Sequence, residues 1–98
     1  MNLTKEAMAD IQNIYDHIEQ DSPQNAAKVV REILAGADSL SFMPTRFRQV
    51  GKSISRGSPV HAVVIRPFIL YYRIEHHSRV LFVLSIYHGR QQQPQRFQ

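Results

Sequence analysis

The spacing of the apolar residues changes about halfway along the chain, and this change limits the possible folds more than any other feature. From Lys5 to about Gln20, apolar side chains recur at steps of three and four residues, which places them on one face of a helix. A second stretch with the same period runs from Pro23 to about Ser41. After Pro59 the chain instead carries runs of β-branched and aromatic residues separated by short turns, as strands do. The sequence therefore predicts two helices followed by a group of strands.

Both helices have recognisable starts. Thr4 is placed to cap the first helix, and Ser22 followed by Pro23 is a typical start for the second. Because the link between them is short, we expect an antiparallel hairpin. Gly36 is expected to weaken the second helix slightly. The first helix should expose its polar residues Asp10, Asn13, Asp16 and Glu19.

Three strand-like runs follow, VHAVVIR, PFILYYRIE and RVLFVLSIYH, with short turns between them. They predict an antiparallel meander, and a further short strand fits the region from Phe47 to Val50. The apolar face of such a sheet must be covered, and the helix hairpin is the obvious cover. We therefore predict an α+β fold in which the hairpin packs on one face of a three- or four-stranded antiparallel sheet. Residues 1–90 form one domain in this prediction, and residues 91–98 form a mobile glutamine-rich tail.

Strand alternation assigns each side chain to one face of the sheet. Toward the helices, we expect from the first two runs His61, Val63, Ile65, Phe68, Leu70, Tyr72 and Ile74. In the last run, the same face should hold Val80, Phe82, Leu84 and Ile86. The opposite face should then hold Ile69, Tyr71, Arg73, Glu75, Leu81, Val83, Ser85 and Tyr87, with Arg66 beside them and Arg90 at the rim.

Charge is unevenly distributed along the chain. Residues 1–45 carry three basic and seven acidic side chains, a balance of −4, whereas residues 46–98 carry nine basic side chains and only Glu75 as an acid, a balance of +8. Eight of the nine are arginines, which pair with phosphate or carboxylate groups and stack on flat rings. Basic and aromatic side chains on an open sheet face suit single-stranded nucleic acid or an acidic protein segment. A solvated basic surface without a partner fits the same pattern, and the sequence leaves both readings open.

Several classes of function are disfavoured by what the chain lacks. Without cysteine there is no thiol chemistry, no disulfide and no cysteine-bound zinc, and the histidines are not spaced as metal ligands. No apolar run reaches the roughly 18 to 20 residues needed to span a bilayer, and the start lacks the features of a secretory signal. We therefore expect a cytoplasmic protein without a cofactor, a metal or a membrane-bound part.

The segments LTKEAMADIQNIYDHIEQDSP, RPFILYYRIE and VLFVLSIYHGR, in this order and spacing, resemble the RelE/ParE superfamily of toxins from type II toxin–antitoxin systems. The resemblance covers the chain from Leu3 to Arg90. It implies a helix hairpin on a twisted antiparallel sheet, and a cognate antitoxin that wraps and neutralises the toxin in a hetero-oligomer. It also implies a full strand before the first helix, for which only Met1 to Thr4 are available.

The superfamily contains two activities, and the residues favour one of them. RelE-like members cleave mRNA in the ribosome, whereas ParE-like members resemble this chain in lacking the nuclease residues and inhibit DNA gyrase. Where the RelE-like pattern has an arginine in the middle strand, this chain has Ile69. Gly89 stands where that pattern has a basic residue at the end of the last strand, and Arg90 follows one position later. The stretches ILYYRIE and YHGR instead resemble the ParE-like branch, which implies a gyrase inhibitor that works by binding.

A ribosome-dependent mRNA endonuclease is the alternative. RNA cleavage of this kind needs a base, an acid and a cation, and the candidate catalytic residues are then Arg66, Arg73, His88 and Arg90. Tyr87 and His88 are adjacent on a strand and point to opposite faces, so His88 continues the helix-facing side, where a hydrogen-bonded structural histidine is the commoner outcome. In the favoured reading, the region is a docking surface with partner-binding residues Arg66, Tyr71, Arg73, Tyr87, His88 and Arg90. A third reading is an inactive relic that binds only the antitoxin.

Overall fold

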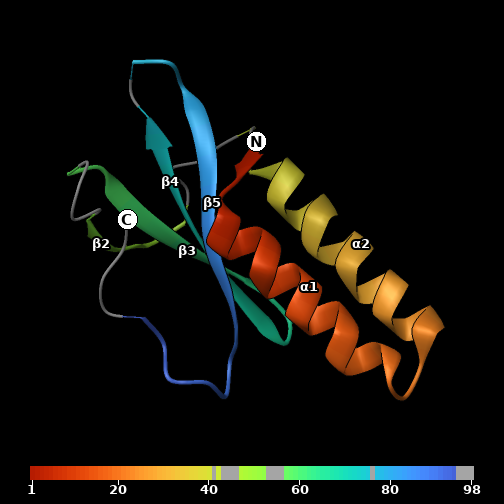
Figure 1. The fold of residues 1–98 in the computed structure, drawn as a ribbon. Coiled ribbons are helices and arrows are strands. Elements are labelled where there is room, and N and C mark those ends of the chain that lie inside the picture. Colours follow the sequence, from red (N-terminus) through yellow and green to blue (C-terminus); the bar gives the residue numbers. More distant parts are fainter. Residues whose placement is uncertain (41, 43–46, 53–56, 76, 95–98) are drawn as a thin grey trace.

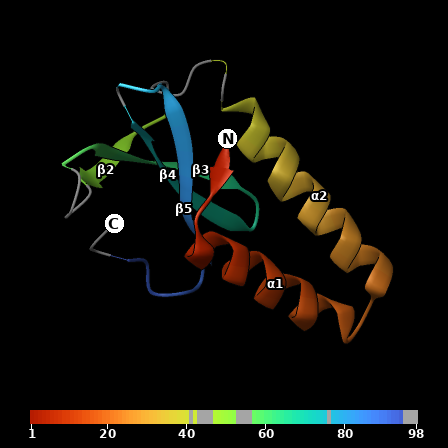
Figure 2. The same cartoon turned by 45° about the horizontal axis from the view of Figure 1, so that its top comes forward.

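The two predicted helices pack on a single sheet in the computed structural model, which describes residues 1–40, 42, 47–52, 57–75 and 77–94. Its elements are, in order, β1 (Asn2–Leu3), α1 (Lys5–Glu19), α2 (Pro23–Ser39), β2 (Gln49–Lys52), β3 (Pro59–Ile65), β4 (Phe68–Glu75) and β5 (Val80–His88). The helices run antiparallel to each other beside one face of the sheet (Figure 1), and a turned view shows both of them on this same side (Figure 2). The predicted α+β class is confirmed.

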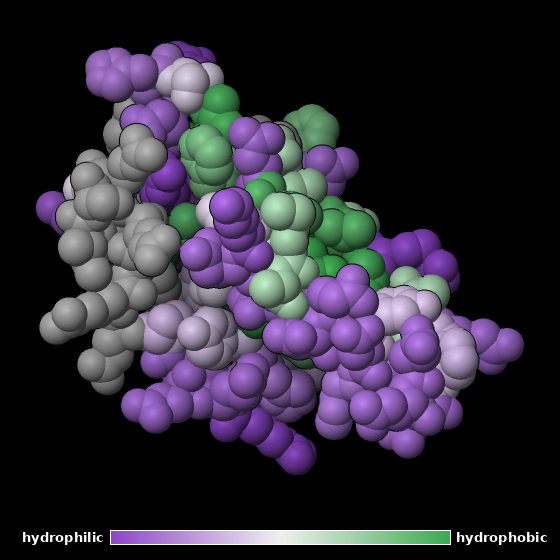
Figure 3. All heavy atoms as spheres, in the orientation of Figure 1, coloured by the Kyte–Doolittle hydropathy of each residue, from purple (hydrophilic) through white to green (hydrophobic). Residues whose placement is uncertain are grey.

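Both helices begin where the sequence predicts. The Thr4 hydroxyl accepts a hydrogen bond from the Ala7 amide (3.2 Å), and the Ser22 hydroxyl accepts one from the Asn25 amide (3.2 Å). Pro23 is the first residue of α2, as expected. Hydrophilic side chains make up much of the surface where α1 runs, with some hydrophobic ones among them (Figure 3), and the exposed residues of this helix include the predicted Asn13, Asp16 and Glu19.

The sheet has five strands in the order β1-β5-β4-β3-β2. β3, β4 and β5 form the predicted antiparallel meander, and β2 is the predicted short strand, displaced toward Lys52. The strand implied before the first helix is the two-residue β1, which pairs parallel to β5. The prediction of three or four antiparallel strands is therefore wrong in the number of strands and at this one parallel pair.

The main core lies between the helix hairpin and the sheet. Its buried side chains come from both layers: Ala7, Ile33, Ala37, Leu40, Val63, Phe68, Leu70, Tyr72, Leu81, Val83 and Ile86. α2 approaches β3 so closely that a Cβ on Gly36 would lie 2.6 Å from Ile65 Cδ1. Gly36 therefore permits the close contact of helix and strand, a role that its helix propensity alone does not reveal.

The predicted faces are correct for β3 and β4 but wrong in the middle of β5. The register between β4 and β5 shifts between Tyr71 and Tyr72, which leaves Leu84 as an extra residue in β5, a β-bulge. Before and at the bulge, the structure reverses the predicted faces of Leu81, Phe82, Val83 and Leu84. Past the bulge the alternation returns to its predicted phase, and Ile86 lies in the main core as expected.

The sheet face away from the helices holds a second, smaller core. Its buried members are Val60, Ala62, Tyr71 and Leu84, with Val50, Ile69, Phe82 and Tyr87 packed against them. The sequence predicted an open basic and aromatic face here. Instead, apolar contacts fill much of this face, and Tyr71 is only 4% exposed.

Candidate functional site

Two backbone segments that each carry an arginine are hydrogen-bonded to each other where the sheet ends. The Gly89 amide, just after β5, donates a hydrogen bond to the carbonyl oxygen of Pro67 in the β3–β4 turn (2.9 Å). A Cβ on Gly89 would lie 3.3 Å from that same oxygen, so a larger residue would crowd this contact. Arg66 and Arg90 each neighbour one member of this pair in sequence, and both are exposed. The strand end therefore presents two cations on adjoining backbone segments.

Tyr87 and His88 sit on opposite faces of β5, as alternation requires. Tyr87 belongs to the second core and meets Tyr71 edge to face, with ring centroids 6.1 Å apart. His88 lies on the helix side, edge-on to Phe68 at 5.6 Å. Both are partly exposed, and we name Arg66, Tyr87, His88 and Arg90 together the strand-end surface.

The His88 ring forms a hydrogen bond with the backbone of a neighbouring residue. Its Nδ1 accepts a hydrogen bond from the Arg90 amide (3.0 Å), so the neutral ring carries its proton on Nε2. This contact holds the turn that follows β5. It also means that Nδ1 is engaged and is not a free proton acceptor.

Arg73 and Tyr71 are placed differently from the rest of the predicted site. Arg73 is 6% exposed, its Nη1 lies 3.2 Å from Glu75 Oε2, and its guanidinium stands 4.5 Å above the Phe82 ring. Its buried Nε has no hydrogen-bond partner among the described residues. Burial raises the pKa of Tyr71, although Arg48 lowers it, so the phenol stays protonated and donates to Gln93. Tyr71 therefore supports Tyr87 near the strand end from within the second core, whereas Arg73 lies toward the other end of β4, paired across the sheet with Phe82.

Ile69 faces the side that the sequence predicted. It packs against the second core and is paired across the sheet with Val64 on one side and Tyr87 on the other. Val64 is 62% exposed. An apolar row, rather than a cation, therefore lies where the RelE-like pattern has its arginine.

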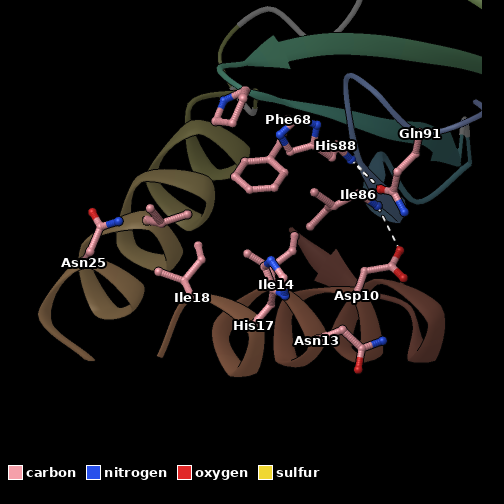
Figure 4. A pocket seen from close by; sticks show the side chains of 12 residues that line it. Asp10, Asn13, Ile14, His17, Ile18, Asn25, Phe68, Ile86, His88 and Gln91 are labelled. Carbon is pink, nitrogen blue, oxygen red and sulfur yellow. Dashed lines mark hydrogen bonds between the residues drawn. The ribbon is translucent and has the colours of Figure 1, made fainter. Parts of the chain in front are cut away.

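A cleft of about 620 Å³ opens between the helix hairpin and the end of the sheet. Side chains from α1, α2, β4 and β5 point into it (Figure 4). Ile14, Ile18, Phe68 and Ile86 supply apolar walls, and His88, which belongs to the strand-end surface, also lines the cleft. The sequence did not predict this cleft, because its walls come together only when the hairpin packs on the sheet.

Asp10 lines the cleft, which corrects the prediction that it faces solvent. Its Oδ2 accepts a hydrogen bond from the Ile86 amide (2.9 Å), drawn as a dashed line in Figure 4. Burial is the main cause that raises the pKa of Asp10. The hydrogen bond from Ile86 lowers this pKa and the nearby Glu6 raises it, both to a smaller extent. A signal was present in the sequence, since Asp10 is three residues from Ala7 and four from Ile14, on the same helical face.

The described residues offer neither a metal cluster nor a membrane-spanning helix. No three His, Asp or Glu side chains of that part of the chain gather closely enough to hold a metal ion. Neither α1 nor α2 is long and apolar enough to cross a bilayer.

The fold and its strand end define a class of protein. A helix hairpin on one face of a twisted sheet, with arginines at the end of the last strand, is the arrangement that the resemblance to small toxins of toxin–antitoxin systems implies. The model of the family described as ParE toxin of type II toxin–antitoxin system, parDE, matches residues 1–93. The chain belongs to this ParE toxin family.

Two individual proteins are similar over nearly the whole chain. Y4kP of Sinorhizobium fredii, a candidate toxin by its name, is 36% identical over 92 residues, which are 94% of this chain and 90% of that protein. A solved chain of the chromosomal ParDE toxin–antitoxin system from P. aeruginosa superposes with a TM-score of 0.66 and 26% identity, covering 90% of this chain and 95% of that chain. The family thus implies an antitoxin as a partner of this chain.

Proposed function

We propose that this toxin inhibits DNA gyrase by binding, and that its strand-end surface is the docking site. The observation that carries the proposal is the pair of exposed arginines, Arg66 and Arg90, on two backbone segments that the Gly89–Pro67 hydrogen bond joins. Arginines held on a firm backbone bind carboxylates well, because less side-chain and backbone freedom is lost on binding. Tyr71 acts from the second core by supporting Tyr87, and Arg73 packs over Phe82 further along the β4–β5 pair.

The geometry favours docking over RNA cleavage. A nuclease needs a base, an acid and a cation that converge on one phosphate. Here Tyr87 and His88 lie on opposite faces of β5, and Nδ1 of His88 is engaged by Arg90. Arg73 is buried and bound to Glu75. The mRNA endonuclease with Arg66, Arg73, His88 and Arg90 is therefore the second candidate.

In this proposal the antitoxin neutralises the toxin by covering the same region. An acidic segment would pair with Arg66 and Arg90, and apolar side chains of an amphipathic segment would enter the adjoining cleft. The cleft walls offer Ile14, Ile18, Phe68 and Ile86 for such contacts. Toxin, antitoxin and gyrase would then meet in the cytoplasm as a hetero-oligomer or as a toxin–gyrase complex.

The test measures both target activities on the same material. The native chain is induced without its antitoxin, and extracts are assayed for plasmid supercoiling and for mRNA cleavage. We expect supercoiling to be lost while mRNA stays intact. Cut mRNA with normal supercoiling would establish the endonuclease instead, and no change in either activity would leave an inactive relic.

A matched set of variants locates the docking site. Replacing Arg66 and Arg90 together by Ala should raise the toxin concentration needed for half-inhibition of purified gyrase by about tenfold or more, as expected for paired anchor residues. The control is Arg31→Ala, which removes an exposed arginine from α2. Equal inhibition by the double variant and the control would place the docking site elsewhere.

A further inference from the structure

The edge of β5 beyond β1 has no neighbouring strand in the described chain. β1 pairs only with Phe82 and Val83, so the backbone groups further along this edge need other partners. Asp10 accepts the Ile86 N–H from α1. At His88, the partners come from the segment that follows β5.

Two glutamines form hydrogen bonds with the backbone amide and carbonyl groups of His88. The His88 amide donates to Gln91 Oε1 (2.6 Å), a bond visible in Figure 4. The His88 carbonyl oxygen accepts from the Gln91 amide (2.9 Å) and from Gln93 Nε2 (3.1 Å). Gln91 and Gln93 thus occupy the positions at which an added strand would form hydrogen bonds.

Gln93 also ties this segment to the second core. Its Nε2 donates to the Gln91 carbonyl oxygen (2.8 Å), and its Oε1 accepts from the Tyr71 hydroxyl (2.7 Å). The orientation of this amide is set by its partners, because the reverse orientation would turn Oε1 toward two carbonyl oxygens. Tyr71 is buried in β4, so the segment after β5 is anchored to a buried side chain of the sheet.

Hydrogen bonds hold the backbone on both sides of Arg90. On one side, Gly89 is bonded to Pro67, and on the other side Gln91 and Gln93 hold the chain against His88. The Arg90 amide itself is bonded to His88 Nδ1. The position of Arg90 relative to Arg66 therefore depends on contacts at both ends of this short segment.

We propose that Gln91 and Gln93, anchored by Tyr71, form a glutamine clamp that positions Arg90 beside Arg66 for an acidic surface of the partner. The inference rests on the proposed function, which it deepens. Gln93 is a positioning residue, and it acts by ordering the segment before the partner arrives, which reduces the entropy lost on binding. The clamp also covers the edge of β5 against unwanted strand pairing.

The first test examines the clamp in the free toxin by amide hydrogen exchange. Gln93→Ala removes all three side-chain contacts, and Gln93→Glu keeps an acceptor for Tyr71 but loses both N–H donors. Both variants should speed exchange of the His88 and Gln91 amides by about three- to tenfold, the effect of losing one ordinary hydrogen bond. The control is Gln92→Ala at the exposed neighbouring position. Unchanged exchange at His88 and Gln91 in both Gln93 variants would overturn the clamp.

The second test examines its effect on the partner. Purified gyrase is titrated with native chain, Gln93→Ala, Tyr71→Phe and the double variant. Each single change should raise the half-inhibitory concentration by about three- to tenfold. The double variant should be no worse than the stronger single one, because both changes remove the same Tyr71–Gln93 hydrogen bond. Additive effects, or an unchanged half-inhibitory concentration despite faster exchange, would overturn the positioning role. A native chain that leaves gyrase active would refute the proposed function, while the exchange result would still decide the clamp.

Discussion

Asp10 is a residue whose role depends on a strand that lies far away in the sequence. Its carboxylate accepts the Ile86 N–H, and burial is the main reason that its pKa is raised above the ordinary value of 3.8. A raised pKa means that the ionised carboxylate is less favourable in the folded chain than in the unfolded chain. The stability linked to Asp10 is therefore fully present below about pH 4 and is lost as the pH rises through the folded pKa.

Replacing Asp10 by Asn keeps an acceptor for the Ile86 N–H and removes the charge. We expect D10N to be at least as stable as the native chain at pH 7, with its advantage disappearing below about pH 4. D10A offers no acceptor and should be about 1 kcal/mol less stable than D10N. Urea unfolding at both pH values measures these free energies. A native chain that loses stability relative to D10N on acidification would contradict the direction of the pKa shift.

Among the elements, the start of α1 is joined to the bulge of β5 through one side chain. The Thr4 hydroxyl caps α1 and also lies 2.8 Å from the Val83 carbonyl oxygen and 3.1 Å from that of Leu84. The Thr4 amide donates to Val83 as well (3.1 Å). The predicted cap is therefore a tertiary contact too, and it meets β5 at the bulge.

Replacing Thr4 by Ala removes both the cap and the hydroxyl donor. We expect T4A to lower the free energy of unfolding by about 1–2 kcal/mol, whereas T4S should retain most of the native stability because its hydroxyl can make the same bonds. Thermal or urea unfolding of the two variants gives the comparison. If T4S proved as unstable as T4A, the methyl group rather than the hydroxyl would be the stabilising part of Thr4.

Replacing Gly36 by Ala tests the contact between α2 and β3. Overpacking costs about 1–3 kcal/mol and the better helix propensity of Ala returns about 1 kcal/mol, so G36A should destabilise the native chain by about 1 kcal/mol. I65V deletes the Cδ1 atom that would lie 2.6 Å from a Cβ on Gly36. In that background we expect the same change at Gly36 to be neutral or stabilising. Equal effects in both backgrounds, measured by urea unfolding, would show that Ile65 does not limit this site.

For the molecule as a whole, the two signs of charge belong to different parts of the fold. The acidic balance of residues 1–45 includes both helices, and the basic balance of residues 46–98 includes strands β2 to β5 and the strand-end surface. A separated distribution of this kind orients the molecule toward an acidic partner before contact, which mainly affects the association rate.

The association rate with gyrase should therefore depend on salt. We expect it to fall by about tenfold between about 50 mM and about 300 mM salt, because screening shortens the range of the basic end. The Arg66 and Arg90 double variant should show a shallower dependence. Surface plasmon resonance with immobilised gyrase measures both slopes. Identical slopes for the native chain and the double variant would argue that these arginines do not steer the encounter.

The family resemblance and the class of fold could be predicted from the sequence, whereas the candidate site could be predicted only in part. Ile69 was placed on the correct face, and Arg66 and Arg90 are exposed as expected. Arg73 and Tyr71 were expected on an open face, but both are buried, Tyr71 within the second core and Arg73 over the Phe82 ring. The mobility of residues 91–98 stays a prediction: residues 91–94 include the glutamine clamp, and residues 95–98 lie outside the described part of the chain.

The helices, their caps, the meander and the α+β class follow from local sequence, because caps, turns and periodicity act between residues that are close along the chain. The faces of β5, in contrast, depend on how the strands pair. The stretch VLFVLSI is apolar at both odd and even positions, so alternation cannot distinguish its two sides, and the bulge at Leu84 is set by pairing with β4. The same holds for the Asp10–Ile86 bond, the Gly89–Pro67 contact and the glutamine clamp. Each of these joins groups that become neighbours only when helix, turn and strand have packed together.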